Sequence, residues 1–152
     1  MTDTDTDTPS PIDLSQAAAP ALLRRLVAIF YDAFLLAAVL FVAAGLATLL
    51  NGGERIAANN PFYTAYMVVV AFLFFAWFWI HGGQTLGMRA WRFKVIREDG
   101  LPLTWIDTLK RFLLAILSWL PCGLGFLWSL FDEQNRAWHD RFSHTRLVLL
   151  AK

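Results

Sequence analysis

The residues of this chain whose chemistry stands out are an arginine and an aspartate at the start of a strongly apolar stretch. Asp32 is the only formally charged residue between Leu26 and Leu50, and Arg25 precedes it by seven residues. Seven residues are about two helical turns, so both side chains share one helix face, about 10 Å apart along the axis. A carboxylate inside a membrane is costly unless it faces a partner, a cavity or a proton. Asp32 therefore either exchanges a proton or a cation, with Arg25 as its counter-charge, or pins its helix to neighbouring helices, and the sequence favours both interpretations equally.

The sequence shows no pattern that is typical of a metal site or of an enzyme active site. The histidines His81, His139 and His144 are scattered and lack the spacing of metal ligands, and the single cysteine, Cys122, lies in an apolar stretch. The sequence contains no nucleophile with a placed base, no paired catalytic carboxylates and no cofactor motif. We therefore predict no metal site, no cofactor and no enzymatic activity.

Three apolar stretches must position these charges. The chain has 152 residues, of which 57% are hydrophobic and 16% charged, a composition that is unusual for a soluble domain. A membrane-spanning helix needs about 20 apolar residues, and the candidates are residues 26–50, 62–80 and 112–131. We predict an all-α membrane protein with two transmembrane helices and a third membrane segment.

The distribution of basic residues predicts the orientation of the helices. Of the thirteen Lys and Arg residues, two precede the first span, six lie between His81 and Arg111, and Arg55 is the one basic residue in the connection 51–61. Cytoplasmic loops of membrane proteins carry the excess of Lys and Arg. The N-terminus and the middle segment are therefore expected in the cytoplasm, and the connection 51–61 on the other side.

The third segment is interrupted at its centre. Pro121 removes a backbone donor there, and Gly123 and Gly125 loosen the helix. A single crossing would also place the four basic residues of the tail outside. We therefore favour a re-entrant segment that returns the tail to the cytoplasm, with a proline-kinked span as the alternative.

Short strands are expected in the cytoplasmic part. Residues 91–97 alternate apolar and basic side chains with the period of a strand, and residues 145–150 are also strand-like. An isolated strand is unstable without a partner, so we expect these two to pair. Between them, Thr104 and Asp107 resemble a helix N-terminal capping pair.

Residues 1–20 differ in composition from the rest of the chain. Thr and Asp alternate near the N-terminus, followed by prolines and alanines. This composition is typical of a disordered, solvated tail, and its acidic start is unlike a signal peptide. We predict a tail over 1–20 and one membrane domain over 21–152.

Three blocks of the chain resemble the RDD family of bacterial membrane proteins. They are Arg25-Leu26-Val27-Ala28 with Asp32, then Gly83-Gln84-Thr85-Leu86-Gly87-Met88-Arg89, then Trp138-His139-Asp140-Arg141 with the strand-like residues that follow. By position, the namesake arginine and two aspartates would be Arg25, Asp32 and Asp140. The supporting motif residues would be Thr85, Gly87, Arg89 and His139. Met88 departs from the family pattern, in which a basic residue is common, and so does His144, where Gly is frequent.

The resemblance implies a multi-pass protein of the bacterial inner (plasma) membrane, in a family for which transport has been proposed. The leading hypothesis is movement of an ion or small solute that uses the Arg25 and Asp32 charges. Three short segments cannot readily enclose a pathway, so a homo-oligomer or other membrane subunits are expected, together with membrane lipids and no nucleic acid. The alternative is a non-transporting assembly or accessory subunit in which the charges are structural, with a structural role favoured for Asp140.

Overall fold

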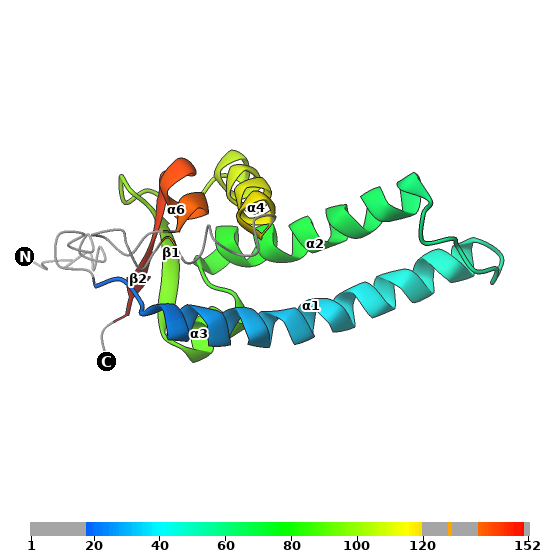
Figure 1. Ribbon diagram of the computed structural model, residues 1–152, viewed down its shortest axis with the longest axis horizontal. Helices are drawn as coiled ribbons and strands as arrows, with labels where there is room; N and C mark the ends of the chain where they lie inside the picture. The colour runs from blue at the N-terminus through cyan, green and yellow to red at the C-terminus, as the bar shows by residue number, and fades with distance from the viewer. Residues whose placement is uncertain (1–17, 120–127, 129–136, 151–152) are drawn as a thin grey trace, which may run out of the picture.

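Two long apolar helices form an antiparallel hairpin in the computed structural model, which describes residues 18–119, 128 and 137–150. Helix α1 spans Leu22–Leu50 and helix α2 spans Pro61–Gly82. At 1.5 Å per residue they are about 44 Å and 33 Å long, enough to cross about 30 Å of hydrocarbon. They lie side by side, and residues 51–60 join them at one end of the molecule (Figure 1).

Local signals begin and end α2. The Asn60 side chain accepts hydrogen bonds from the backbone N–H groups of Phe62 and Tyr63 at 2.9 and 3.3 Å. Gly83 ends the helix with a φ of 66°, and an added Cβ there would lie 2.6 Å from the carbonyl oxygen of Val95. Only glycine tolerates both the left-handed backbone and this close approach. The chain therefore turns sharply at the end of the hairpin that is opposite residues 51–60.

A two-stranded sheet lies at this second end. Strand β1 (Phe93–Arg97) pairs antiparallel with strand β2 (Thr145–Leu149), so that Phe93 faces Leu149 and Arg97 faces Thr145. Short helix α3 (Leu86–Ala90) precedes β1, and short helix α6 (Trp138–Phe142) precedes β2. The predicted strand pairing is confirmed, and it brings two segments about 50 residues apart to the same end of the hairpin.

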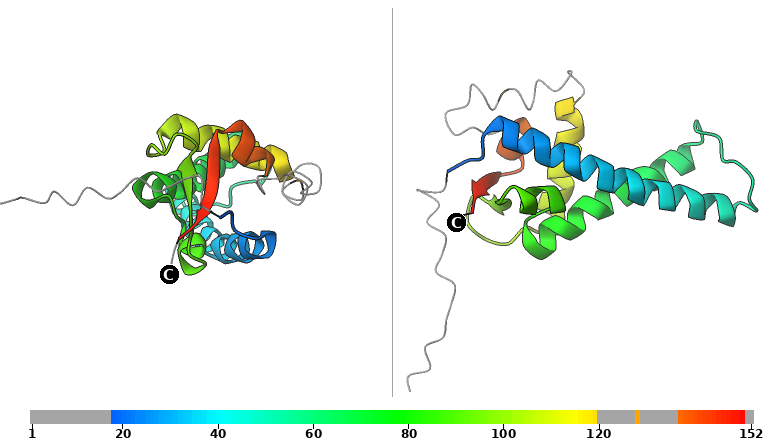
Figure 2. Two further views of the ribbon diagram at one scale, coloured as in Figure 1. Left: turned by 90° about the vertical axis from the view of Figure 1, so that its left-hand side faces the viewer. Right: turned by 90° about the horizontal axis from the view of Figure 1, so that it is seen from below.

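Helix α4 (Trp105–Trp119) lies across the hairpin rather than alongside it, as the right-hand view of Figure 2 shows. It begins with the expected capping pair, since the Thr104 N–H donates to the Asp107 carboxylate at 2.9 Å and the Asp107 N–H donates to the Thr104 hydroxyl oxygen at 3.3 Å. The helix covers the first part of the predicted third segment. The remainder, with Pro121 and the glycines, lies outside the described residues, as does the predicted tail except for residues 18–20.

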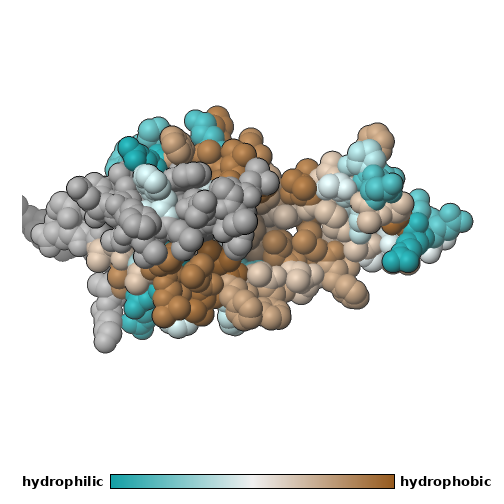
Figure 3. All heavy atoms as spheres, in the orientation of Figure 1, coloured by the Kyte–Doolittle hydropathy of each residue, from teal (hydrophilic) through white to brown (hydrophobic). Residues whose placement is uncertain are grey.

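On helices α1 and α4 many polar and apolar side chains are distributed the opposite way from a soluble protein, whereas the sheet buries apolar residues such as Phe93 and Val95. Phe41 on α1 is 81% exposed, whereas Arg25 and Asp32 on the same helix are buried. Helix α4 likewise buries Thr108, Arg111 and Ser118 and exposes large aliphatic side chains. Hydrophobic surface extends along the helices, and hydrophilic surface gathers at the two ends of the molecule (Figure 3).

This distribution fits a lipid environment. A large exposed apolar surface is unfavourable in water, and buried charges on helices are typical of membrane interiors. Both α1 and α2 are long and apolar enough to span a membrane. The two helices and the small sheet agree with the predicted architecture, and together with the inverted surface they suggest a membrane protein.

Candidate functional site

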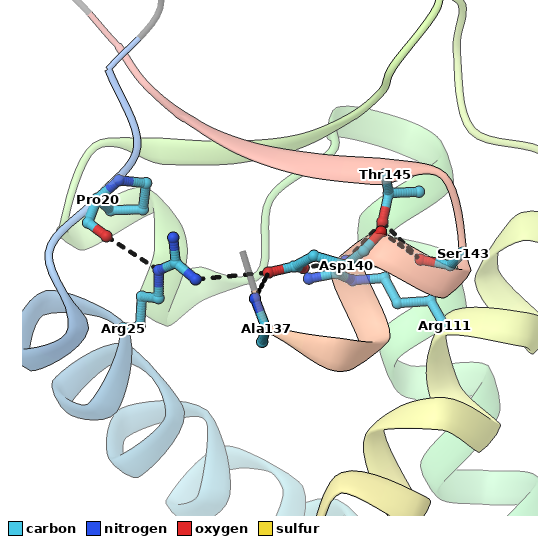
Figure 4. A network of polar contacts seen from close by, with 7 residues as sticks. All are labelled: Pro20, Arg25, Arg111, Ala137, Asp140, Ser143 and Thr145. Carbon is cyan, nitrogen blue, oxygen red and sulfur yellow. Dashed lines mark hydrogen bonds and ion pairs between the residues drawn. The ribbon is translucent and has the colours of Figure 1, made fainter. Parts of the chain in front are cut away.

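A buried aspartate between two arginines forms the centre of the charged site. The Asp140 carboxylate accepts from Arg111 Nη1 at 2.6 Å and from Arg25 Nη1 at 3.4 Å, and also from the Ala137 backbone N–H at 3.1 Å. All three charged side chains are at least 94% buried. Figure 4 shows Asp140 between the two guanidinium groups. Here we call Arg25, Asp140 and Arg111 the Asp140 cluster.

The Asp140 cluster joins segments that are distant in sequence. Arg25 lies on the first turn of α1 and also donates from Nε to the carbonyl oxygen of Pro20 at 2.9 Å. Arg111 lies on α4 and also donates to the Thr145 hydroxyl oxygen on β2 at 2.6 Å, while Asp140 itself belongs to α6. The cluster therefore connects α1, α4, α6 and β2 through charged hydrogen bonds, which are the stronger kind.

Arg111 was not among the residues singled out from the sequence. It had been counted with the basic residues that determine topology, because it directly precedes the third apolar segment. A usable signal exists in the spacing of Thr108, Arg111 and Ser118, which places three polar side chains on one face of an otherwise apolar helix. That face is the buried one.

Asp32 occupies a second, different environment. Its carboxylate accepts from the Gly87 backbone N–H at 2.8 Å and from the Thr85 hydroxyl, and the Thr85 oxygen accepts from the Met88 N–H at 3.2 Å. An added Cβ at Gly87 would collide with the carbonyl oxygen of Ala28 and lie 2.9 Å from the Asp32 carboxylate. Glycine at this position therefore allows α3 to approach α1 and hold Asp32.

The structure thus separates residues that the sequence placed in one pair. Arg25 and Asp32 share a face of α1, as predicted, but within the described residues Arg25 forms an ion pair with Asp140, and Asp32 is held by α3. Thr85 and Gly87 contact Asp32 directly. Arg89, which we had grouped with them, is exposed on the same short helix. His139 lies in α6, and its side chain is outside the described part of the structure.

The two environments meet at a cavity of about 230 Å³ between α1, α2 and α4. Its charged lining residues are Arg25, Asp32 and Arg111, and most of the others are apolar, among them Phe75 and Phe112. Within the described ranges, no group of three or more His, Cys, Asp or Glu residues is arranged to hold a metal ion. The cavity is therefore lined by a buried carboxylate, two buried guanidinium groups and mainly apolar side chains.

The structure is a helical hairpin that exposes apolar side chains and buries charged ones at its sheet end. These features place the chain in the class of small, membrane-like helical proteins. The family model of the RDD family matches residues 19–144. The chain therefore belongs to the RDD family, as the three sequence blocks had indicated. Neither the curated proteins nor the solved structures that were compared with the chain gave a match.

Proposed function

We propose that this protein moves, or helps to move, an ion or small solute across the bacterial inner membrane, with Asp32 as the group that exchanges a proton or cation. The observation that carries this proposal is the position of Asp32, whose side chain is 5% exposed and lies on the wall of the cavity. Ionisable residues retained inside membrane bundles commonly mark ion and proton pathways. The proposed role is not enzymatic.

The donors around Asp32 suit a change of protonation. Within the described residues, both of its hydrogen bonds come from neutral groups, the Thr85 hydroxyl and the Gly87 N–H. A hydroxyl can donate to a carboxylate or accept from a protonated carboxyl group, so Thr85 can serve either state. The exchange at Asp32 would therefore leave the ion pairs of the Asp140 cluster intact.

The proposed orientation places the sheet end in the cytoplasm. Arg89, Arg92 and Lys94 lie near this end, whereas Arg55 lies in the connection at the opposite end. With this orientation Asp32 lies in the cytoplasmic half of the bilayer, and the basic residues can contact anionic lipid headgroups. Since α1, α2 and α4 alone cannot readily enclose a pathway, a second copy or other membrane subunits would complete it, and nucleic acid is not an expected partner.

A second candidate is a non-transporting assembly or accessory subunit. It is supported by the Asp140 cluster, which connects four elements and needs no solute to compensate its charges. In this case Asp32 would also be structural and would hold α3 against α1 through Gly87.

Ion flux through purified protein in sealed vesicles separates the two candidates. Under an imposed proton or sodium gradient, Asp32→Asn should abolish flux while expression and oligomeric state remain normal, because Asn keeps the shape of the side chain and cannot ionise. Asp99→Asn is the matched control, since Asp99 lies in the exposed turn after β1. Undiminished flux in Asp32→Asn would exclude the coupling role, and absence of flux in the unmodified protein would favour the accessory subunit.

A further inference from the structure

Helix α4 exposes an apolar face. Its large exposed side chains are Trp105, Ile106, Leu109, Leu113, Ile116 and Leu117. Neighbouring residues are about 100° apart around a helix axis, so these six side chains fall within about one third of the helix circumference. We call these six residues the α4 apolar face. The charged residue Lys110 lies at the edge of this face and is also exposed.

The polar side of α4 points into the protein. Arg111 donates to the Asp140 carboxylate on α6 and to the Thr145 hydroxyl oxygen on β2, each at 2.6 Å. Thr108 and Ser118 are buried on the same side of the helix. A helix at the surface of a soluble protein has the opposite arrangement, with apolar side chains facing the core and polar ones facing water. The reversed arrangement indicates that the α4 apolar face meets an apolar environment.

Helix α4 crosses the hairpin instead of running alongside it. Trp105 and Phe112 are seven residues apart, about 10 Å along the helix axis, yet both rings lie against the ring of Phe72 on α2, with centroid distances of 6.4 and 5.5 Å. On a helix parallel to α2, two such residues would meet residues of α2 that are about as far apart. The right-hand view of Figure 2 shows the same crossing. If α1 and α2 span the membrane, α4 therefore lies close to the membrane plane.

The contacts between α4 and α2 also indicate a depth. The Phe75 ring lies 6.3 Å from that of Phe112, and the Trp79 ring lies 5.3 Å from the guanidinium carbon of Arg111. Phe75 and Trp79 precede the end of α2 by about 10 and 5 Å along the helix axis. An interfacial helix inserts its apolar face about 5–10 Å into the boundary between headgroups and acyl chains. The crossing point fits that depth at the sheet end of the hairpin.

Lipid acyl chains fit the α4 apolar face better than a second copy of the chain does. Large apolar side chains are also exposed on the other two helices, for example Phe30 on α1 and Leu73 on α2. A second copy would cover one patch of this surface, whereas acyl chains cover all of it. Lys110, at the edge of the face, has a long apolar stem that lets its ammonium group reach the lipid headgroups.

We propose that α4 is an in-plane membrane helix, whose apolar face binds the acyl chains of the leaflet at the sheet end of the hairpin. Lys110 extends from the edge of this face to the headgroups. In this position α4 does not itself cross the membrane. The proposal depends on α1 and α2 as spanning helices. It holds for a transporting or a non-transporting protein, so its failure would leave the flux experiment unaffected.

Fluorescence quenching by nitroxide-labelled lipids measures the depth of α4. The full-length protein is placed in vesicles of phosphatidylcholine and phosphatidylglycerol that carry the nitroxide either near the headgroup or near the end of an acyl chain. Cys122→Ser removes the single native thiol, and Ile106→Cys or Leu117→Cys then carries a thiol-reactive fluorophore. These two positions are exposed, eleven residues apart and on the same side of α4. We expect equal depths for both labels, with stronger quenching by the nitroxide near the headgroup.

A matched pair on α2 provides the control. Phe62→Cys and Leu73→Cys are also at exposed positions, eleven residues apart and on the same side of their helix. Because α2 is proposed to span the membrane, these labels should differ in depth by most of the 16 Å, roughly, that separates them along the axis.

Four results would overturn the proposal. The first is a depth difference within the α4 pair as large as that within the α2 pair, since α4 would then run along the membrane normal. The second is quenching of the α4 labels by aqueous iodide instead of lipid nitroxide, which would place the face in water. The third is quenching by neither reagent, which would indicate that a second copy or another protein covers the face. The fourth is equal depth within the α2 pair, because α2 would then not span the membrane.

Discussion

Asp140 and Asp32 are both buried carboxylates near the sheet end of the hairpin, yet they are held by different kinds of donor. Asp140 lies between two guanidinium groups, whereas Asp32 accepts from a hydroxyl and a backbone N–H. A carboxylate between two arginines forms charged hydrogen bonds with both and connects the elements that carry them. A carboxylate held by neutral donors on a cavity wall keeps the freedom to change its charge. From this comparison we expect a structural role for Asp140, and we propose proton or cation exchange for Asp32.

The largest expected effect is at Asp140. Asp140→Ala leaves Arg25 and Arg111 without their shared carboxylate, and breaking a buried ion pair in this way costs about 3–5 kcal/mol. Thermal unfolding of the protein in detergent, followed by size exclusion and circular dichroism, measures the loss. Asp32→Asn should cost clearly less, because Asn retains an acceptor for the Gly87 N–H. Equal losses of stability in Asp140→Ala and Asp32→Asn would contradict the distinction between the two aspartates.

The next effect concerns the contact that holds Asp32. Gly87→Ala introduces a Cβ that overlaps the Ala28 carbonyl oxygen and lies 2.9 Å from the Asp32 carboxylate, so α3 must move away from α1. Overpacking of this kind costs about 1–3 kcal/mol of unfolding free energy. Gly45→Ala is the control, since nothing lies within 4 Å of its added Cβ, and it should be neutral or stabilising by the same unfolding measurement.

A smaller effect is expected at Thr85. Thr85→Val removes the hydroxyl that donates to Asp32 and should cost about 1–2 kcal/mol, whereas Thr85→Ser keeps the donor and should cost less. If Asp32 exchanges protons, Thr85→Val should also change the pH dependence of flux in vesicles, and Asp140-cluster variants that still fold should not. Identical pH profiles for Thr85→Val and Thr85→Ser would argue against an exchange role.

The smallest effect concerns Asp107, a carboxylate at the surface. Burial opposes its charged form, but hydrogen bonds from Thr104 and the charges of Arg97 and Lys110 outweigh burial and lower the pKa of Asp107. Because the folded pKa is below the unfolded value, the associated stability is present above the unfolded pKa of about 3.9 and is lost as pH falls through the folded pKa. Asp107→Asn should therefore reduce the difference in stability between pH 6 and pH 3 slightly, measured by unfolding at both pH values. An unchanged difference would show that this capping pair contributes nothing to acid sensitivity.

Much of the fold was predictable because it depends on local patterns. The apolar lengths of α1 and α2, the alternation in β1 and the Thr104–Asp107 cap are all visible within a few turns or residues of chain. The pairing of β1 with β2 was also predictable, since two isolated strands at one end of a hairpin need each other. The end of the third segment lies outside the described residues, so the choice between a re-entrant segment and a proline-kinked span stays a prediction.

The partners within the site were harder to predict. The spacing of Arg25 and Asp32 indicates a shared face, but it cannot show that α6 brings Asp140 to Arg25 or that α3 brings Gly87 to Asp32. Arg111 was overlooked for another reason. A basic residue at the start of an apolar segment is already explained by the topology of the membrane protein.

By itself the sequence determined the family, the two long apolar helices and the identity of the costly charges, because hydrophobic length and buried-charge cost are properties of residue type and spacing. Only the tertiary structure decided which residues form ion pairs and hydrogen bonds with these charges. Hydrogen bonds and ion pairs depend on positions within a few tenths of an ångström, and here those positions arise from helix crossings and strand pairing between residues 29 to 115 positions apart. The same packing created the cavity and placed Trp79 and Arg111 on its wall.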